Sequence, residues 1–328
     1  MRTGERAAVD RPSPPGAQPP ALVWFALSVV YVVWGSTYLA IRVAIETMPP
    51  MLMAAVRFLI AGAILYGLSI RRGDRDGDRP GAREWRSATI VGTLLFLGGN
   101  GGVVWAEQRI PSGTAALIVA TVPLWMALLG YVFLRERLPW MAVAGVVVGF
   151  GGTALLVGPS GAGGVDLLGA LVVVAAALAW SIGSRYARRA TLPSRPLVAA
   201  GMQLLCGGVA VTVAGIAGGE LTRIHLDRIS RSSALALLYL IVFGAVVAFT
   251  CYAWLIRTAP TSLVSTYAYV NPAVAVLLGW AFAGERVRPV TIVAGAIIVA
   301  AVAMIVTARR AREPGEPAAG APPVPEKT

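Results

Sequence analysis

Long uncharged runs of apolar residues constrain this chain more than any other feature of its sequence. A helix needs about 20 apolar residues to cross the hydrocarbon core of a bilayer. Runs of that length predict ten membrane-spanning helices, near residues 22–43, 51–70, 87–106, 113–134, 140–157, 167–184, 197–218, 233–255, 261–283 and 290–308. Of the 328 residues, 57% are hydrophobic and only 13% are charged, which excludes a pair of ordinary soluble domains. The sequence therefore predicts an all-α polytopic membrane protein whose largest partner is the lipid bilayer.

Charge placement predicts the orientation of these helices. The 28 Lys and Arg residues against 16 Asp and Glu give a net charge of +12, which in a soluble chain would suggest nucleic acid. Here the arginines gather in alternate connections, above all 71–86, 135–137 and 185–195. We therefore expect no nucleic-acid partner, and the positive-inside rule predicts that both termini are cytoplasmic. Three arginines within 223–231 lie on the predicted outer side and are partly offset by two acidic residues.

The two ends of the chain differ from the rest. Residues 1–21 and 309–328 are rich in Pro, Gly and charged residues, a composition typical of disorder, and we expect both to be cytoplasmic. The chain uses Arg almost to the exclusion of Lys and is rich in Ala, Val and Gly. This composition suggests a GC-rich bacterial genome, and hence an integral protein of the bacterial cytoplasmic (inner or plasma) membrane.

One phrase of the sequence occurs twice. Residues 122–138 read VPLWMALLGYVFLRERL, and residues 271–287 read NPAVAVLLGWAFAGERV. The offset of 149 residues between Pro123 and Pro272 also joins further identical pairs, namely Trp105 and Trp254, Pro111 and Pro260, Gly130 and Gly279, Phe133 and Phe282, Glu136 and Glu285, and Arg137 and Arg286. The chain is therefore predicted to contain two five-helix repeats, at residues 22–158 and 166–308.

The odd number of spans in each repeat has a topological consequence. The second repeat must enter the membrane upside down relative to the first, so the two form an inverted repeat. Inverted repeats let one bundle alternate between states that open to either side, so this symmetry predicts alternating-access transport. The alternative is a duplicated bundle without a transport role, in which the paired prolines only kink helices.

Several short segments, in order and in both halves, are similar to those of a known family. They are WGSTY at 34–38, PP at 49–50, AVRF at 55–58, PSGTAA at 111–116, Pro123, and YAYVNP at 267–272. These segments resemble the EamA-type transporters of the drug/metabolite transporter superfamily, with YedA-like exporters the nearest subgroup. The resemblance implies a ten-helix bundle with cytoplasmic termini and a central substrate cavity, and members that export amino acids, related metabolites or drugs.

Polar and aromatic residues at mid-span depth are candidate substrate contacts, because polar groups in a bilayer need a partner or a water-filled cavity. The candidates are Trp34, Ser36, Thr37, Tyr38, Asn100, Trp180, Ser181, Tyr267, Tyr269 and Asn271. Asn100 lies among four glycines, which let a ligand approach closely. It suits an interhelical hydrogen bond equally well, and the sequence leaves both interpretations open.

Pro123 and Pro272 are candidates for gating or kink positions. Each proline removes the donor for a carbonyl four residues back, at Val119 and Ala268. A freed carbonyl in the membrane interior must face protein, water or substrate. We expect these positions to line the pathway, with a kink packed against other helices as the alternative.

Four charged residues are expected to have structural roles. Arg57 lies inside the second span, about 9 Å from its predicted outer end at 1.5 Å per residue. We expect it to form an ion pair with Glu107 or Glu46. Glu136 and Glu285 end their spans beside arginines. They are predicted to anchor helix ends, and as repeat mates they are candidate gates for opposite states.

Other chemistries lack the residues they need. The G-x-G-x-x-A match at 149–154 lies within a span with no strand before it, so a dinucleotide site is excluded. The single His225 excludes an H-E-x-x-H zinc site, and Cys206 and Cys251 lie in different spans without metal-ligand spacing. No Walker sequence is present, so ATP is not the direct energy source. We expect no metal, no cofactor and no enzyme activity.

The sequence therefore predicts a secondary transporter, with export as the expected direction, for amino acids, related amphipathic solutes or drugs. Two other classes are disfavoured: a membrane-embedded enzyme, because no catalytic constellation is present, and a receptor or scaffold, because no sizeable soluble domain exists. Proton coupling, where present, is assigned to Glu107 or to the charge of the substrate. A homodimer is left open.

Overall fold

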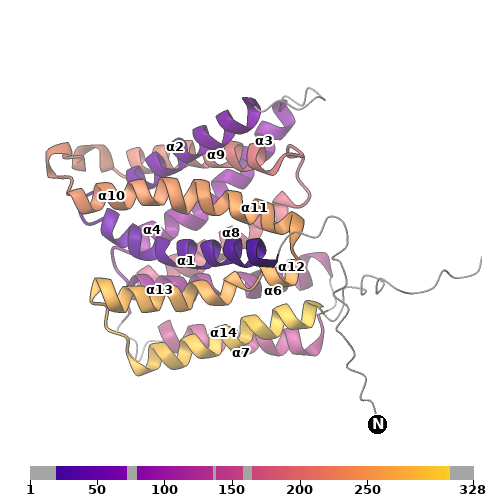
Figure 1. Ribbon diagram of the computed structural model, residues 1–328. Coiled ribbons are helices and arrows are strands. Elements are labelled where there is room, and N and C mark those ends of the chain that lie inside the picture. The colour runs from indigo at the N-terminus through magenta and orange to yellow at the C-terminus, as the bar shows by residue number, and fades with distance from the viewer. Residues whose placement is uncertain (1–19, 72–79, 136–137, 158–164, 311–328) are drawn as a thin grey trace, which may run out of the picture.

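The computed structural model describes residues 20–71, 80–135, 138–157 and 165–310. Within these ranges the regular elements are all helices, and they pack side by side into one bundle (Figure 1). In chain order they are α1 (Pro20–Ala44), α2 (Pro50–Arg71), α3 (Ala82–Gly92), η1 (Thr93–Gly101), α4 (Gly102–Ala106), α5 (Ser112–Val119), α6 (Val122–Leu134), α7 (Trp140–Val157), α8 (Leu167–Ala187), α9 (Pro196–Ala217), η2 (Glu220–Arg223), η3 (Leu226–Arg228), α10 (Arg231–Tyr239), η4 (Leu240–Val247), α11 (Ala248–Thr258), α12 (Thr261–Val264), α13 (Tyr267–Ala283) and α14 (Pro289–Arg310). The predicted all-α fold class is confirmed.

The number of helices long enough to span a membrane differs from the prediction in one place. Nine helices among the described residues are long and apolar enough to cross a membrane, and they match nine of the ten predicted spans within a few residues. The span predicted at 261–283 is broken, because α12 ends at Val264 and α13 begins at Tyr267. What remains is an apolar helix of 17 residues. Apolarity does not reveal a backbone break, so the count of ten is not established by length alone.

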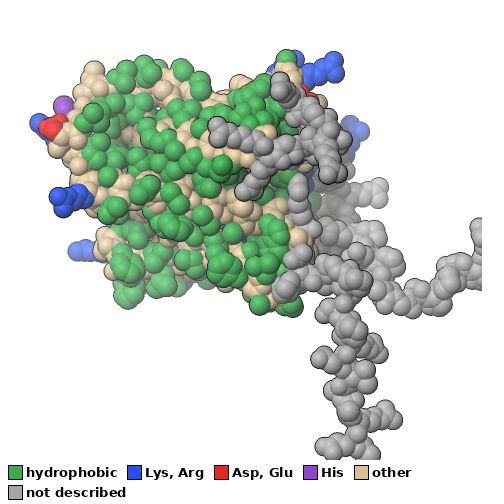
Figure 2. Space-filling view, turned by 45° about the horizontal axis from the view of Figure 1, so that its top comes forward, with side chains coloured by type: hydrophobic (Ala, Val, Ile, Leu, Met, Phe, Trp, Pro, Cys, Tyr) green, Lys and Arg blue, Asp and Glu red, His purple; other side chains and the backbone are tan. Residues whose placement is uncertain are grey.

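The lateral surface of the bundle is apolar. Phe133, Trp140 and Phe282 are 75%, 79% and 76% exposed, an arrangement that water disfavours for a surface of this extent. In Figure 2 hydrophobic side chains cover the face in view, and the charged side chains gather toward its two ends. Hydrocarbon is the solvent that matches such a belt. The chain is an integral membrane protein.

Helix packing interlocks the two halves of the chain. The most extensive contacts join α2 to α9 and α7 to α14, which are the second and fifth spans of the two repeats. The contact of α1 with α13 has its mate in the contact of α8 with α5 and α6. Figure 1 shows α2 beside α9, α1 beside α13 and α7 beside α14. The most extensive contacts between the halves thus have equivalents, as expected for a two-repeat fold.

Each half also contains one stretch of π-helix, a rare form with a wider turn that often marks functional sites. These stretches are η1 (Thr93–Gly101) and η4 (Leu240–Val247). Shifted by 149 residues, η1 would cover 242–250, which overlaps η4. The repeat therefore extends to a local distortion of the backbone that the apolar pattern of the sequence did not predict.

The two repeats differ at the prolines. In the first repeat the break falls at Ala120 and Thr121, and Pro123 lies in the first turn of α6, where its missing N–H needs no partner. In the second repeat the break precedes Tyr267, and Pro272 lies inside α13. The two prolines thus occupy different positions in their helices. Val119 is the last residue of α5. Ala268 lies inside α13, four residues before Pro272 in the same helix.

Close contact between α3 and α9 gives the first prediction. A Cβ on Gly92 would lie 2.3 Å from the carbonyl oxygen of Gln203, whereas no atom lies within 4 Å of a Cβ built on Gly67 in α2. We expect Gly92→Ala to destabilise the protein by about 1–3 kcal/mol, because backbone must move. Gly67→Ala should be neutral or slightly stabilising, since Ala is the better helix former. Thermal unfolding of both variants in one detergent checks this, and equal melting temperatures would contradict the packing described here.

Candidate functional site

An aromatic cluster surrounds Trp34 of α1. Its ring lies 5.5 Å from Phe249, 5.1 Å from Tyr252 and 5.3 Å from Tyr267, measured between centroids. The Trp34 indole Nε1 donates a hydrogen bond of 3.2 Å to the carbonyl oxygen of Gly244 in η4. Three elements from the second half, η4, α11 and α13, thus meet one side chain of the first half. Aromatic faces of this kind suit the apolar or aromatic body of a solute.

Polar groups tie this cluster to the broken helix. The Asn271 amide nitrogen donates to the carbonyl oxygens of Tyr267 and Tyr31, both at 3.2 Å, in the amide orientation that satisfies its neighbours. The Tyr31 hydroxyl is hydrogen-bonded to the Thr266 hydroxyl, next to the break between α12 and α13. The predicted residues Trp34, Tyr267 and Asn271 are therefore brought together.

The remaining predicted contacts are placed elsewhere. Trp180 lies edge-on to Phe96 at 6.4 Å, and Ser181 is buried and donates to the carbonyl oxygens of Ala177 and Val122. The Ser36 hydroxyl is hydrogen-bonded to the Tyr239 hydroxyl and donates to the Val33 carbonyl oxygen. Thr37 donates to the Trp34 carbonyl oxygen, and the Asn100 amide donates to the Leu95 carbonyl oxygen at 3.5 Å. Tyr38 and Tyr269 pack against the apolar core around α5. The hydroxyls of Ser36, Thr37 and Ser181 donate to backbone carbonyls of their own helices, which leaves them less available to a solute.

Two charged residues are buried without partners. Arg57 is 5% exposed and Glu107 is fully buried. Within the described residues the one ion pair closer than 4.0 Å joins Arg109 to Asp166 at the surface, so the expected pair of Arg57 with Glu107 is not formed at that distance. Glu46, the other expected partner, is exposed. Among the described residues, five of the six buried side-chain atoms that lack a hydrogen-bond partner belong to Arg57, Glu107 and Ser112.

Glu107 directly follows the span that ends at Ala106. Burial raises the pKa of its carboxyl well above the usual range, and the charge of Glu285 raises it further. Arg42 and Arg57 act in the opposite direction. Arg42 donates to the backbone carbonyl of Glu107 and not to its carboxylate. The neutral carboxylic acid is therefore the favoured form in this conformation.

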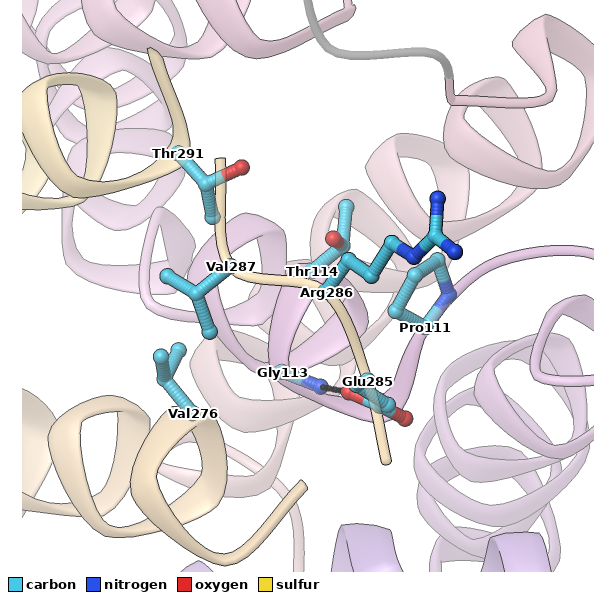
Figure 3. A pocket seen from close by; sticks show the side chains of 8 residues that line it. All are labelled: Pro111, Gly113, Thr114, Val276, Glu285, Arg286, Val287 and Thr291. Carbon is cyan, nitrogen blue, oxygen red and sulfur yellow. Dashed lines mark hydrogen bonds between the residues drawn. The ribbon is translucent and has the colours of Figure 1, made fainter. Parts of the chain in front are cut away.

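Glu285 joins the two halves at the same end of the bundle. Its carboxylate accepts hydrogen bonds from the backbone N–H groups of Ser112 at 2.6 Å and Gly113 at 3.1 Å, the first residues of α5. Figure 3 shows Glu285 lying across this helix start beside Pro111. A carboxylate at a helix N-terminus satisfies free donors and interacts favourably with the helix dipole. The approach requires Gly279, since a Cβ there would lie 2.4 Å from Glu285 Oε2.

Glu220 makes a second cap of the same kind. It accepts from the backbone N–H groups of Met51 at 3.2 Å and Leu52 at 2.9 Å, at the start of α2. Both caps run from the second half of the chain to the first. The sequence reasoning missed Glu220, although an acidic residue directly after a span was a usable signal. Glu136, the repeat mate of Glu285, lies outside the described residues.

A hollow of about 220 Å³ opens near this end, lined by Arg42, Ile45, Glu46 and Gln108. It lies beside the segment that carries Glu107. Phe249 and Tyr252, which complete the aromatic cluster, were also missed, although their spacing within a predicted span was visible. In the described part of the chain no group of three His, Cys, Asp or Glu residues could hold a metal ion.

Comparison with known proteins gives consistent results. The sequence matches the EamA-like transporter family over residues 20–158 and 167–307. It is 38% identical over 284 residues to the Escherichia coli K12 protein named "Uncharacterized inner membrane transporter YedA". The aligned region covers 85% of this chain and 89% of that protein. It is 26% identical over 286 residues to the "Probable terminal-alkyne amino-acid exporter" of Streptantibioticus cattleyicolor, which covers 86% and 92% respectively. One crystal structure aligns with 90% of this chain and 100% of the crystallised chain, at 24% sequence identity and a TM-score of 0.59. This similarity indicates a shared fold.

The cap on α5 gives the second prediction. Glu285→Ala leaves two helix N–H groups without their acceptor, so we expect a loss of about 1–3 kcal/mol in stability. Glu46→Ala is the matched control, because the Glu46 side chain is exposed at the same end. Thermal unfolding in detergent measures both. A Glu285→Ala protein that melts with the Glu46→Ala protein would show that the cap contributes nothing.

Proposed function

The chain belongs to the EamA-like transporter family, and on that premise we propose that it is a secondary transporter that exports small amphipathic solutes by alternating access. The proposed solutes are amino acids, related metabolites or drugs. The observation that carries the proposal is the interlocked packing of two repeats, in which contacts between the halves occur in equivalent pairs. The similarity to a protein named as an amino-acid exporter supports both the direction and the class of solute.

The aromatic cluster and the caps have distinct roles in this proposal. Trp34, Tyr267 and Asn271 contact the solute between the halves, and Pro272 allows α13 to bend. Glu285 acts as a gate at the predicted outer end, where its bonds to α5 hold the two halves together. Release of these bonds accompanies opening. Glu136 is assigned the equivalent role in the opposite state from the sequence repeat alone.

The proposed location is the bacterial cytoplasmic membrane, with both termini in the cytoplasm. The start of α1 and the end of α14 lie at the same end of the bundle in Figure 1, which supports termini on one side. The arginine-rich connections support the cytoplasm as that side. A non-enzymatic role accords with the transporter names of the relatives. The homodimer and the absence of a nucleic-acid partner stay predictions.

Efflux from proteoliposomes tests the function. Vesicles are preloaded with a mixed pool of amino acids, nucleosides and aromatic cations, and wild type is compared with Tyr267→Ala. We expect wild type to release one solute class selectively and Tyr267→Ala to lose at least about 90% of that rate, in line with the stacking surface lost. Tyr131→Ala is the control, since Tyr131 is 58% exposed on the outer surface of the bundle. No efflux of any class, or equal loss in both variants, would count against the proposal.

Proton coupling through Glu107 is proposed in addition. The charged groups that act electrostatically on this carboxyl are Glu285, Arg42 and Arg57. Because the folded-state pKa of Glu107 is raised, the protein loses stability as the pH rises toward that pKa, while Glu107→Gln keeps the neutral form at every pH. We expect the melting temperature of wild type to fall with rising pH more steeply than that of Glu107→Gln.

Flux provides the functional half of this test. Efflux of a neutral solute by wild type should slow when the pH gradient is collapsed, and Glu107→Gln should be insensitive to the gradient. Wild-type flux of a neutral solute that ignores the gradient would refute proton coupling, and the transport proposal would stand without it.

A further inference from the structure

The guanidinium of Arg57 sits at a junction of three helices. A Cβ built on Gly244 of η4 would lie 3.4 Å from Arg57 Nη2 and 3.1 Å from Thr37 Cγ2. Arg57 on α2 therefore lies close to the point where α1 and η4 meet, beside Gly244. The carbonyl oxygen of the same Gly244 accepts the indole N–H of Trp34. One residue thus separates the guanidinium from the aromatic cluster.

Among the described residues, this guanidinium lacks the hydrogen-bond and ion-pair partners that a buried charge requires. Its Nε and Nη1 atoms are buried without hydrogen bonds, and its nearest aromatic contact is the ring of Phe58 at 5.3 Å. An unpaired charge away from water costs several kcal/mol, so buried arginines are normally paired. A structural ion pair would explain Arg57, but Glu107 is not within 4.0 Å of it. Within the described part of the chain, the guanidinium is therefore left without a counter-charge.

The charged groups around Arg57 indicate what kind of ligand would balance its guanidinium. Glu107 lies within Coulombic range of Arg57 and has no hydrogen bond to either carboxylate oxygen. Its burial favours the neutral acid, which cannot balance the guanidinium. Arg42 is a second positive charge within Coulombic range of Glu107. Glu285 is already engaged by the start of α5. The unbalanced charge is therefore positive, and the group that fits it is an anion.

We propose that Arg57 binds the carboxylate of the exported solute while the apolar body of that solute lies against the Trp34 cluster. A guanidinium recognises a planar carboxylate by charge-assisted hydrogen bonds, and the neighbouring rings select an apolar or aromatic remainder. The substrate class is then a small carboxylic acid with an apolar side chain, zwitterionic or not. This assignment rests on the proposed transport function and narrows it, since cations and nucleosides lack the group that Arg57 requires.

Matched pairs of ligands test the assignment on the purified protein. The probes are alanine, leucine and phenylalanine, each with its amide, and 3-phenylpropionate with 3-phenylpropionamide, titrated at pH 7 with intrinsic tryptophan fluorescence as the readout. We expect at least one acid to bind about tenfold or more tightly than its amide, as the loss of a charged hydrogen bond predicts. In Arg57→Gln the affinity for that acid should fall about tenfold or more and that for the amide should change less than twofold.

Two further variants keep the test decisive. Arg109→Gln removes a cation that is 45% exposed and should preserve the preference for the acid. Arg57→Lys keeps the charge and should retain part of the preference, so it replaces Arg57→Gln where that variant does not fold. Amides that bind as well as acids, absence of binding by every acid, or equal loss of acid and amide binding in Arg57→Gln would overturn the assignment.

Binding and efflux measurements test the Arg57 subsite and the transport function separately. A protein that binds acids through Arg57 but releases none from vesicles would keep the subsite and refute transport. A protein that exports cations or amides with Arg57→Gln unaffected would keep transport and refute the subsite.

Discussion

A bilayer supplies no water to polar groups, so every helix end and every charge that this chain places within its bundle must find a partner from the chain itself or from a solute. The beginnings of α2 and α5 meet this requirement through Glu220 and Glu285. Both carboxylates come from the second half of the chain and both helix starts from the first. The same bonds that satisfy the backbone therefore fix the relative position of the halves, which couples local hydrogen bonding to the conformation of the whole bundle.

Among the described residues, the requirement is left unmet mainly at the buried side chains of Arg57, Glu107 and Ser112, which carry five of the six buried side-chain atoms without a hydrogen-bond partner. Their grouping separates this region from an ordinary packed core, in which buried polar atoms are satisfied. Arg57 lies beside Gly244 of the η4 π-helix, and the carbonyl oxygen of the same glycine accepts a hydrogen bond from the Trp34 indole. Aromatic surface, unpaired charge and a distorted backbone thus occur together between the two halves.

Particular residues show how far sequence reasoning reached. The apolar runs predicted the helices, and the 149-residue offset predicted two repeats whose packing is equivalent in space. Trp34, Tyr267 and Asn271 were candidate substrate contacts because all three stand out as polar or aromatic within apolar spans, and the structure places them side by side. Ser36, Thr37 and Ser181 looked similar in sequence, but their hydroxyls bond to carbonyls of the preceding turn. Residue type does not reveal which way a hydroxyl turns, so these residues could not be separated in advance.

The sequence by itself determined the helical class, the membrane environment and the duplication, because each depends on hydrophobicity and identity summed over many residues. Tertiary structure decided the break between α12 and α13, the capping by Glu220 and Glu285, and the failure of Arg57 to pair with Glu107. These features depend on distances between residues far apart in the chain. Small changes in the distance between two charged groups decide whether they form an ion pair, and no pattern along the sequence gives that distance.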